Sequence, residues 1–116
     1  MIKVKLLGMQ QLKNKLTKLT SGVKREFEQL NTRTAFSIER DAKKVAPVRF
    51  GFLRSGIKTN IYQGGMATEV VATKDYSAYV EYGTRRMKAR PFMEPAWEKN
   101  KAEYMREIEK LVKAAL

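Results

Sequence analysis

The chain has 116 residues and contains neither histidine nor cysteine. Without histidine it lacks the commonest general base at neutral pH and the commonest metal ligand. Without cysteine it has no disulfide framework, no thiolate chemistry and no zinc site of the usual composition. We therefore expect a protein that is not an enzyme and binds no cofactor or metal, synthesised and folded in the cytoplasm.

Other familiar patterns are missing as well. No apolar run approaches the ~20 residues that span a bilayer, and the glycines lack the spacing of a phosphate-binding loop. The sequence has no zinc finger, no RNP-type aromatic signature and no GXXG loop. Serine and lysine are too abundant to exclude a Ser–Lys catalytic pair, but the pattern singles none out.

What the chain has in excess is positive charge: 24 Lys and Arg against 12 Asp and Glu, for a net charge of +12. Residues 1–50 carry 12 basic and 4 acidic side chains and residues 51–92 carry 7 and 3, whereas residues 93–116 carry 5 of each. Such an excess raises affinity for polyanions. It is compatible both with a basic face that meets an acidic partner subunit and with nucleic-acid binding.

The first residues predict a strand followed by a helix. Apolar and basic side chains alternate over residues 2–6, which is the period of a strand with one buried face. Gly8 ends this pattern. From Met9 to Leu19, apolar residues recur at three- and four-residue steps, which predicts an amphipathic helix.

A second helical pattern runs from Val23 to Val45. Ser21 can cap its start, and Pro47 should stop it because the residue before proline avoids helical geometry. The two patterns fit either one long kinked helix or two helices that meet near Gly22. A lysine-rich helix with a leucine stripe also fits a membrane surface, but the acidic residues on its polar face favour an ordinary core helix.

The middle of the chain predicts a β-hairpin and a short helix. Residues 57–62 alternate, Gly64-Gly65 supplies a turn, and residues 66–73 are rich in β-branched side chains. The segment from Asp75 to Gly83 then resembles a helix, with Asp75 as N-cap and Gly83 as C-terminal stop. Three tyrosines follow one side of this helix at three-residue steps: Tyr76, Tyr79 and Tyr82.

The segment from Thr84 to Arg90 carries four positive charges and little apolar content, which predicts an exposed loop. A final helix opens between Pro91 and Pro95, and its apolar positions predict the buried face Trp97, Tyr104, Ile108, Leu111, Val112 and Ala115. Together the patterns predict one α+β domain over residues 1–116. Its small antiparallel sheet, the N-terminal strand plus the hairpin, should pack against a long N-terminal helical segment and a C-terminal helix.

Three stretches have more specific content: Ala46–Ile57 (APVRFGFLRSGI), Tyr76–Thr84 (YSAYVEYGT) and Ala89–Ala96 (ARPFMEPA). In this order and spacing they resemble the tail-component family of long-tailed bacteriophages and prophages, whose members are tail-completion or head–tail joining proteins. The resemblance covers nearly the whole chain. One departure is Phe50, where the family more often has Thr or Ser before the glycine, and it affects only a local turn contact.

The resemblance implies a structural subunit of the virion, at the head–tail junction or the tail end, without catalysis. It implies assembly with itself, commonly as a hexameric ring, and with other head-connector or tail proteins. DNA would pass through the ring without sequence-specific binding. The main alternative function is that of a small basic nucleic-acid-binding protein.

The candidate interface follows from the tyrosine motif and the basic loop, and it comprises Tyr79, Glu81, Tyr82, Thr84, Arg85, Arg86, Lys88 and Arg90. Glu81 is predicted to make a charge-assisted contact with Arg85, Arg86 or Arg90 of a neighbouring subunit. The alternative is that Glu81 caps or solvates its own short helix. The loop itself is compatible with a contact to another ring or to the tube, with a lumen surface that faces DNA, and with plain solvation.

Overall fold

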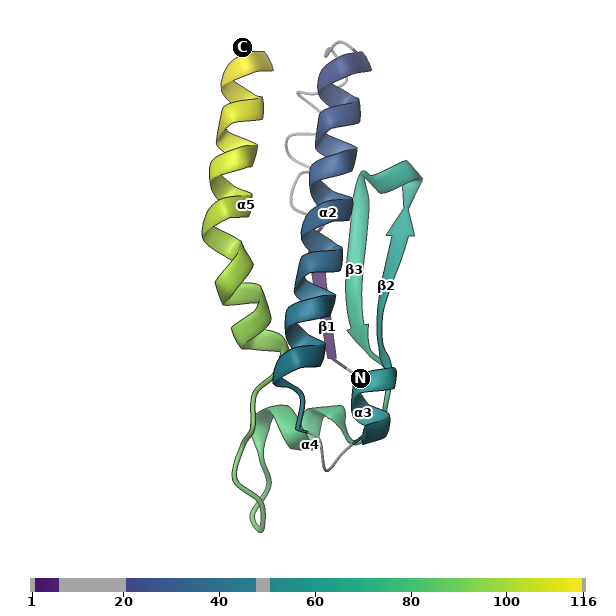
Figure 1. Ribbon diagram of the computed structural model, residues 1–116, viewed down its shortest axis with the longest axis vertical. Coiled ribbons are helices and arrows are strands. Elements are labelled where there is room, and N and C mark those ends of the chain that lie inside the picture. Colours follow the sequence, from purple (N-terminus) through teal and green to yellow (C-terminus); the bar gives the residue numbers. More distant parts are fainter. Residues whose placement is uncertain (1, 7–20, 48–50, 116) are drawn as a thin grey trace.

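The computed structural model describes residues 2–6, 21–47 and 51–115. In chain order its elements are β1 (Ile2–Leu6), α2 (Ser21–Val45), α3 (Gly51–Ser55), β2 (Ile57–Tyr62), the 3-10 turn η2 (Gln63–Gly65), β3 (Ala67–Ala72), α4 (Ser77–Tyr82) and α5 (Met93–Ala115). Helices α2 and α5 lie side by side along the long axis of the molecule, and the sheet flanks α2 (Figure 1). The predicted α+β class is confirmed. No described helix is long and apolar enough to cross a membrane.

The N-terminal strand and the hairpin form one antiparallel sheet, as the sequence predicts, and the structure gives the strand order as β1-β3-β2. Val70 of the central strand pairs with Val4 of β1 and with Thr59 of β2. The hairpin turn needs glycine at Gly65, whose φ is +115° and whose Cβ would lie 2.9 Å from the Glu28 carbonyl oxygen of α2. The Gly-Gly turn therefore also seats the hairpin against the helix.

Helix α2 ends at Val45, two residues before Pro47, as expected from the restriction that proline places on the preceding residue. Three predictions fall on parts of the chain that the structure does not describe. They are the helix over residues 9–19, the side-chain cap at Ser21 and the turn contact at Phe50. After the gap, α3 is a short helix that the sequence did not predict. Its Arg54 donates from Nη2 to the carbonyl oxygen of Ala46, at 3.3 Å, and so ties α3 back to the end of α2.

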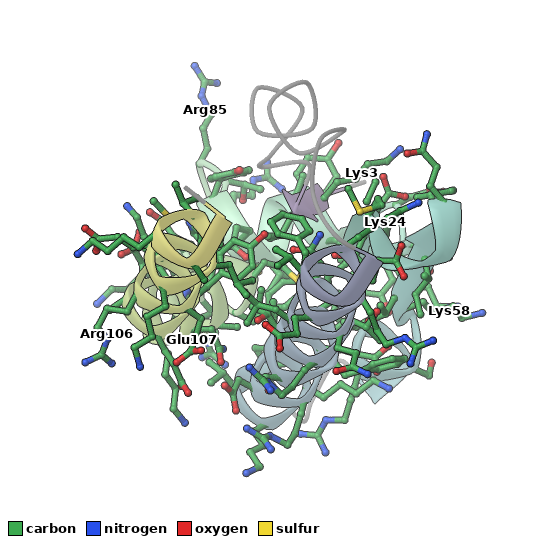
Figure 2. The ribbon with its side chains drawn as sticks, turned by 90° about the horizontal axis from the view of Figure 1, so that it is seen from above. Lys3, Lys24, Lys58, Arg85, Arg106 and Glu107 are labelled. Carbon is green, nitrogen blue, oxygen red and sulfur yellow. The ribbon has the colours of Figure 1, made fainter. Side chains whose placement is uncertain are left out.

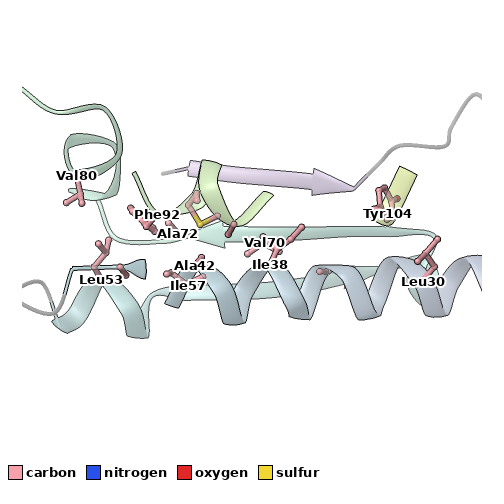
Figure 3. Packing of buried hydrophobic residues seen from close by; sticks show 14 of the residues in the cluster. Leu30, Ile38, Ala42, Leu53, Ile57, Val70, Ala72, Val80, Phe92 and Tyr104 are labelled. Carbon is pink, nitrogen blue, oxygen red and sulfur yellow. The ribbon is translucent and has the colours of Figure 1, made fainter. Parts of the chain in front are cut away.

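The core lies where the inner face of α2 meets the sheet, α4 and α5 (Figure 3). Its fully buried side chains include Phe27, Ile38, Leu53, Ile57, Val70, Val80 and Phe92. From the predicted face of α5, Tyr104 and Ile108 are buried, whereas Trp97, Leu111 and Val112 are partly buried and pack against this core. The ring of Trp97 meets that of Tyr104 edge to face, with 6.2 Å between centroids.

Asn31 is a buried polar residue that joins three elements. Its Nδ2 donates to the carbonyl oxygens of Gly65 and Met66, at 3.0 and 3.1 Å, and its Oδ1 accepts from the Tyr104 hydroxyl at 2.5 Å. The helix α2, the hairpin turn and α5 are thus connected through one side chain. Burial raises the pKa of Tyr104 to about 12, so this hydroxyl stays protonated and continues to donate at all ordinary pH values.

Asp41 is the second buried polar contact between α2 and α5. Its carboxylate accepts from Nδ2 of Asn100 at 2.9 Å and lies 3.7 Å from Lys99 Nζ and 3.5 Å from Arg40 Nε. Burial by itself raises the pKa of Asp41, but the hydrogen bond and the two positive charges outweigh it and lower the pKa below the ordinary value of 3.8.

We expect acidification to weaken the fold through Asp41. A carboxyl whose pKa is lower in the folded state stabilises the protein above its unfolded-state pKa, and this contribution is lost as the pH falls through the folded-state value. The Asp41→Asn variant does not titrate. Its free energy of unfolding should therefore fall less than that of the wild type between about pH 5 and about pH 3. Urea unfolding at both pH values measures this, and equal losses in the two proteins would contradict it.

One predicted cap is wrong. Asp75 was expected to cap the short helix, but α4 begins at Ser77 and its N-cap position is Tyr76, which makes no side-chain cap hydrogen bond. The reason is a preceding turn in which the Ser77 amide donates to the Lys74 carbonyl at 3.0 Å. Asp75 lies inside that turn instead of at the helix end.

Candidate interface at the α4 end

The tyrosines of α4 do not share one environment. Tyr76 is half-buried against the core, whereas Tyr79 and Tyr82 are 60% and 70% exposed. Steps of three residues fall short of the 3.6-residue helical turn, so the side chains rotate by about 60° per step away from the buried position. Val80 holds the opposite side of the helix in the core. The exposed pair faces outward, where a partner can reach it.

Gly83 ends α4, as predicted, and turns the chain sharply. Its amide donates to the Tyr79 carbonyl at 2.8 Å, and its φ and ψ of 80° and 173° lie in a region that is essentially restricted to glycine. A Cβ here would lie 2.8 Å from the Ala89 nitrogen and 2.9 Å from the Met87 oxygen. The glycine therefore lets the two arms of the following loop come into backbone contact.

The segment from Thr84 to Arg90, hereafter the basic loop, is built as a tight structure. The Thr84 amide donates to the Met87 carbonyl at 2.8 Å, and its Oγ1 accepts from the Arg86 and Met87 amides at 3.2 and 3.1 Å. At the far end, the Arg90 amide donates to the Val80 carbonyl at 2.8 Å. The loop thus leaves α4 and returns to it at fixed points.

The cations of the basic loop are exposed, as predicted: Arg85, Arg86, Lys88 and Arg90. None of them forms an ion pair with any residue that the structure describes. The loop projects beyond the end of the helical pair (Figure 1), and Arg85 points away from the body of the protein (Figure 2). The four charges and the two exposed tyrosines of α4 therefore lie at the same end of the molecule.

Glu81 has a role that the sequence reasoning missed. It is 3% exposed, and its Oε1 accepts from the Phe92 and Met93 amides at 3.2 and 2.9 Å, while Oε2 accepts from the Glu94 amide at 3.4 Å. Glu81 therefore caps the start of α5. It does not cap its own helix α4, and it does not lie on an exposed surface. The available signal was indirect: the start of α5 has Pro91 and Phe92 in place of a local capping side chain, so its free amides need an acceptor from elsewhere.

Among the described residues, no group of three or more acidic side chains is placed to hold a metal ion. Three residues of the Tyr76–Thr84 motif, Glu81, Gly83 and Thr84, instead build the junction between α4, the basic loop and α5. Comparison with protein-family models gives a match over residues 10–83 to the family described as "Bacteriophage HK97-gp10, putative tail-component". The chain belongs to this HK97-gp10-like family. No curated protein and no solved structure matches the chain.

Membership makes the protein a structural component of a bacteriophage tail, and therefore of the virion, whose contacts are with other phage structural proteins. The match includes the end of α4 up to Gly83 and stops immediately before the basic loop. The resemblance found in the sequence is confirmed at the level of the family.

Proposed function

We propose that this tail component completes the tail or joins it to the head connector, as one subunit of a ring, commonly a hexamer, around the path of the DNA. In this proposal the α4 end contacts a neighbouring subunit or an adjoining tail or connector protein. The contact residues are Tyr79, Tyr82, Arg85, Arg86, Lys88 and Arg90, with Thr84 shaping the loop. Glu81 acts as a positioning residue, because its carboxylate is already bound within the chain.

The observation that carries the proposal is the basic loop itself. An exposed segment with four unpaired cations costs self-repulsion, yet this one is fixed by hydrogen bonds at both ends and at its turn. A prearranged loop loses little conformational entropy on binding. Arginine and tyrosine are also the residues enriched at the energetic centres of protein interfaces. The combination favours a protein partner over plain solvation.

Charge reversal at Arg85, Arg86 and Arg90 tests the contact. Variants with glutamate at all three positions should lose ring assembly and lower the yield of infectious particles by about tenfold or more, because several interface charges then repel the partner. The matched control reverses Lys58, Lys101 and Arg106, which are exposed elsewhere, and should assemble normally. Sedimentation and negative-stain microscopy with the connector and tail proteins give the readout. Unchanged assembly and infectivity would remove the loop from the interface.

The rival function makes a different prediction. A dedicated nucleic-acid-binding protein of this charge should bind duplex DNA at about nanomolar affinity as a monomer or dimer, with a steep salt dependence. A ring subunit should bind DNA weakly and without regard to sequence. A monomer with tight DNA binding at physiological salt would overturn the proposed assembly role.

A further inference from the structure

A second basic surface runs along α2, on the side away from the core. Exposed residues follow one another there at three- and four-residue steps: Arg25, Gln29, Arg33, Phe36, Arg40 and Lys44. At 3.6 residues per turn these steps keep the six side chains within about 100° of arc, over about 29 Å of helix. We call this set the α2 stripe. The stripe lies on α2, whereas the basic loop follows α4 and is distant from the stripe in the sequence.

The α2 stripe holds four cations and no acid. Arg25, Arg33 and Lys44 form no ion pair within the described part of the chain, and Arg40 lies 3.5 Å from the buried carboxylate of Asp41. Most of the positive charge is thus left without a partner inside the molecule. A row of cations at this spacing fits an extended anionic surface.

Acidic side chains occur only at the margins of the stripe. Glu26 is exposed beside its first residue, and the half-buried Glu39, next to Arg40, lies 3.9 Å from Lys43 Nζ. Glu28 borders a shallow depression between α2 and the hairpin turn, and Glu103 borders a groove between α2 and α5; Arg33 lines both hollows. Arg33, near the centre of the stripe, therefore lies between two hollows.

Phe36 bears on the class of partner. It lies near the middle of the stripe, 48% exposed, one turn from Arg33 and one turn from Arg40. A surface that binds only phosphates gains nothing from an exposed phenylalanine, whereas an aromatic side chain flanked by arginines is typical of the centre of a protein interface. The stripe thus favours a protein over a nucleic-acid backbone.

A second copy of this chain is a poor occupant. Residues 93–116 are its most acidic part, and they carry as many basic as acidic side chains, 5 of each. Residues 1–50 and residues 51–92 each have a basic excess. Charge complementarity therefore requires a different protein with a net acidic surface.

We propose that the α2 stripe docks on an acidic surface of another phage structural protein, with Phe36 entering an apolar recess and the cations pairing around it. The proposal rests on membership of the tail-component family and not on the ring position proposed above. The α2 stripe is unchanged in the variants of the basic loop. An experiment that contradicts the proposed ring contact of the loop therefore does not contradict the docking of the stripe, and the reverse also holds.

The first test reverses charge at Arg33 and Lys44, which have no ion pair to lose in the described structure. The double glutamate variant should reduce incorporation into particles by about tenfold or more. The matched control, Lys101→Glu with Arg106→Glu, makes the same charge change on the exposed side of α5 and should be incorporated normally. Thermal melting of both variants verifies folding. Equal incorporation of the two variants would overturn the proposal.

The second test places a photo-crosslinking phenylalanine analogue at position 36 during particle assembly. The expected product joins position 36 to an acidic segment of a different virion protein, and charge reversal in that segment should restore incorporation of the Arg33→Glu, Lys44→Glu variant. A crosslink to DNA, to lipid or to a second copy of the chain would overturn the proposal. So would the absence of any crosslink in particles that contain the labelled protein.

Discussion

Replacing Glu81 with alanine should lower the free energy of unfolding by about 2 to 4 kcal/mol, because three backbone amides at the start of α5 lose their acceptor in a buried setting. For a domain of this size the melting temperature should fall by about 10 °C or more. Calorimetry or thermal melting measures the change. The size of the effect follows from burial, since exposed amides would bind water instead.

Loss of the Glu81 cap should also have a local effect, besides its effect on stability. The basic loop is held between α4 and α5, so loss of the cap should free it and speed trypsin cleavage after Arg85, Arg86 and Lys88. Glu81→Gln retains an amide oxygen and should lose about half as much stability. Glu94→Ala, in the first turn of α5 but exposed, should change stability by less than about 1 kcal/mol. A Glu81→Ala protein that melts within about 2 °C of the wild type would contradict the capping role.

Replacing Asn31 with alanine should cost about 3 to 4 kcal/mol. The change removes the donor for the Gly65 and Met66 carbonyls and the acceptor for the Tyr104 hydroxyl, and it leaves buried polar groups unpaired. Asn31→Asp should be comparably harmful, since a carboxylate cannot donate to the two carbonyls. Denaturant unfolding at pH 7 gives the free energy of each variant.

A double-mutant cycle isolates the contact between Asn31 and Tyr104. Tyr104→Phe alone should cost about 1 to 2 kcal/mol. The double variant should be less destabilised than the sum of the two single variants by about 0.5 kcal/mol or more, because both partners of one bond are then absent. Gln29→Ala, exposed on the same helix, is the control and should be nearly neutral. Strict additivity of Asn31→Ala and Tyr104→Phe would exclude the coupling.

The regular elements could be predicted from the sequence because each leaves a local periodic signal. The alternation at residues 2–6, the Gly-Gly turn of the hairpin and the helical spacing before Pro47 each depend on neighbours within a few positions. The exposed basic loop followed from composition alone. These local features are sufficient to predict the α+β class, and no contact between distant residues is needed for it.

The rest depends on partners far apart in the chain. Asn31 bonds to residues 34, 35 and 73 positions away, and Glu81 caps a helix that begins beyond the loop. No periodicity reports such pairs. The position of Glu81 beside the basic loop predicts a contact with an arginine of a neighbouring subunit or a cap on its own short helix, and neither reading points to the start of α5. In the same way, α3 has only five residues, too few to show a helical period.

The position of β3 at the centre of the sheet constrains the order of folding. β2 pairs with β3 across a short turn, with Ile61 opposite Thr68, whereas β1 reaches β3 only by bringing Ile2 opposite Ala72. The chain segment closed by the β1–β3 pair is about ten times as long as the one closed by the hairpin, and closing it costs about 2 kcal/mol more in chain entropy. During synthesis, the first strand leaves the ribosome long before the strand that it pairs with. It therefore has no partner in the sheet until β3 has been made, and the lower entropy cost of the hairpin favours a sheet in which the earliest-made strand joins last.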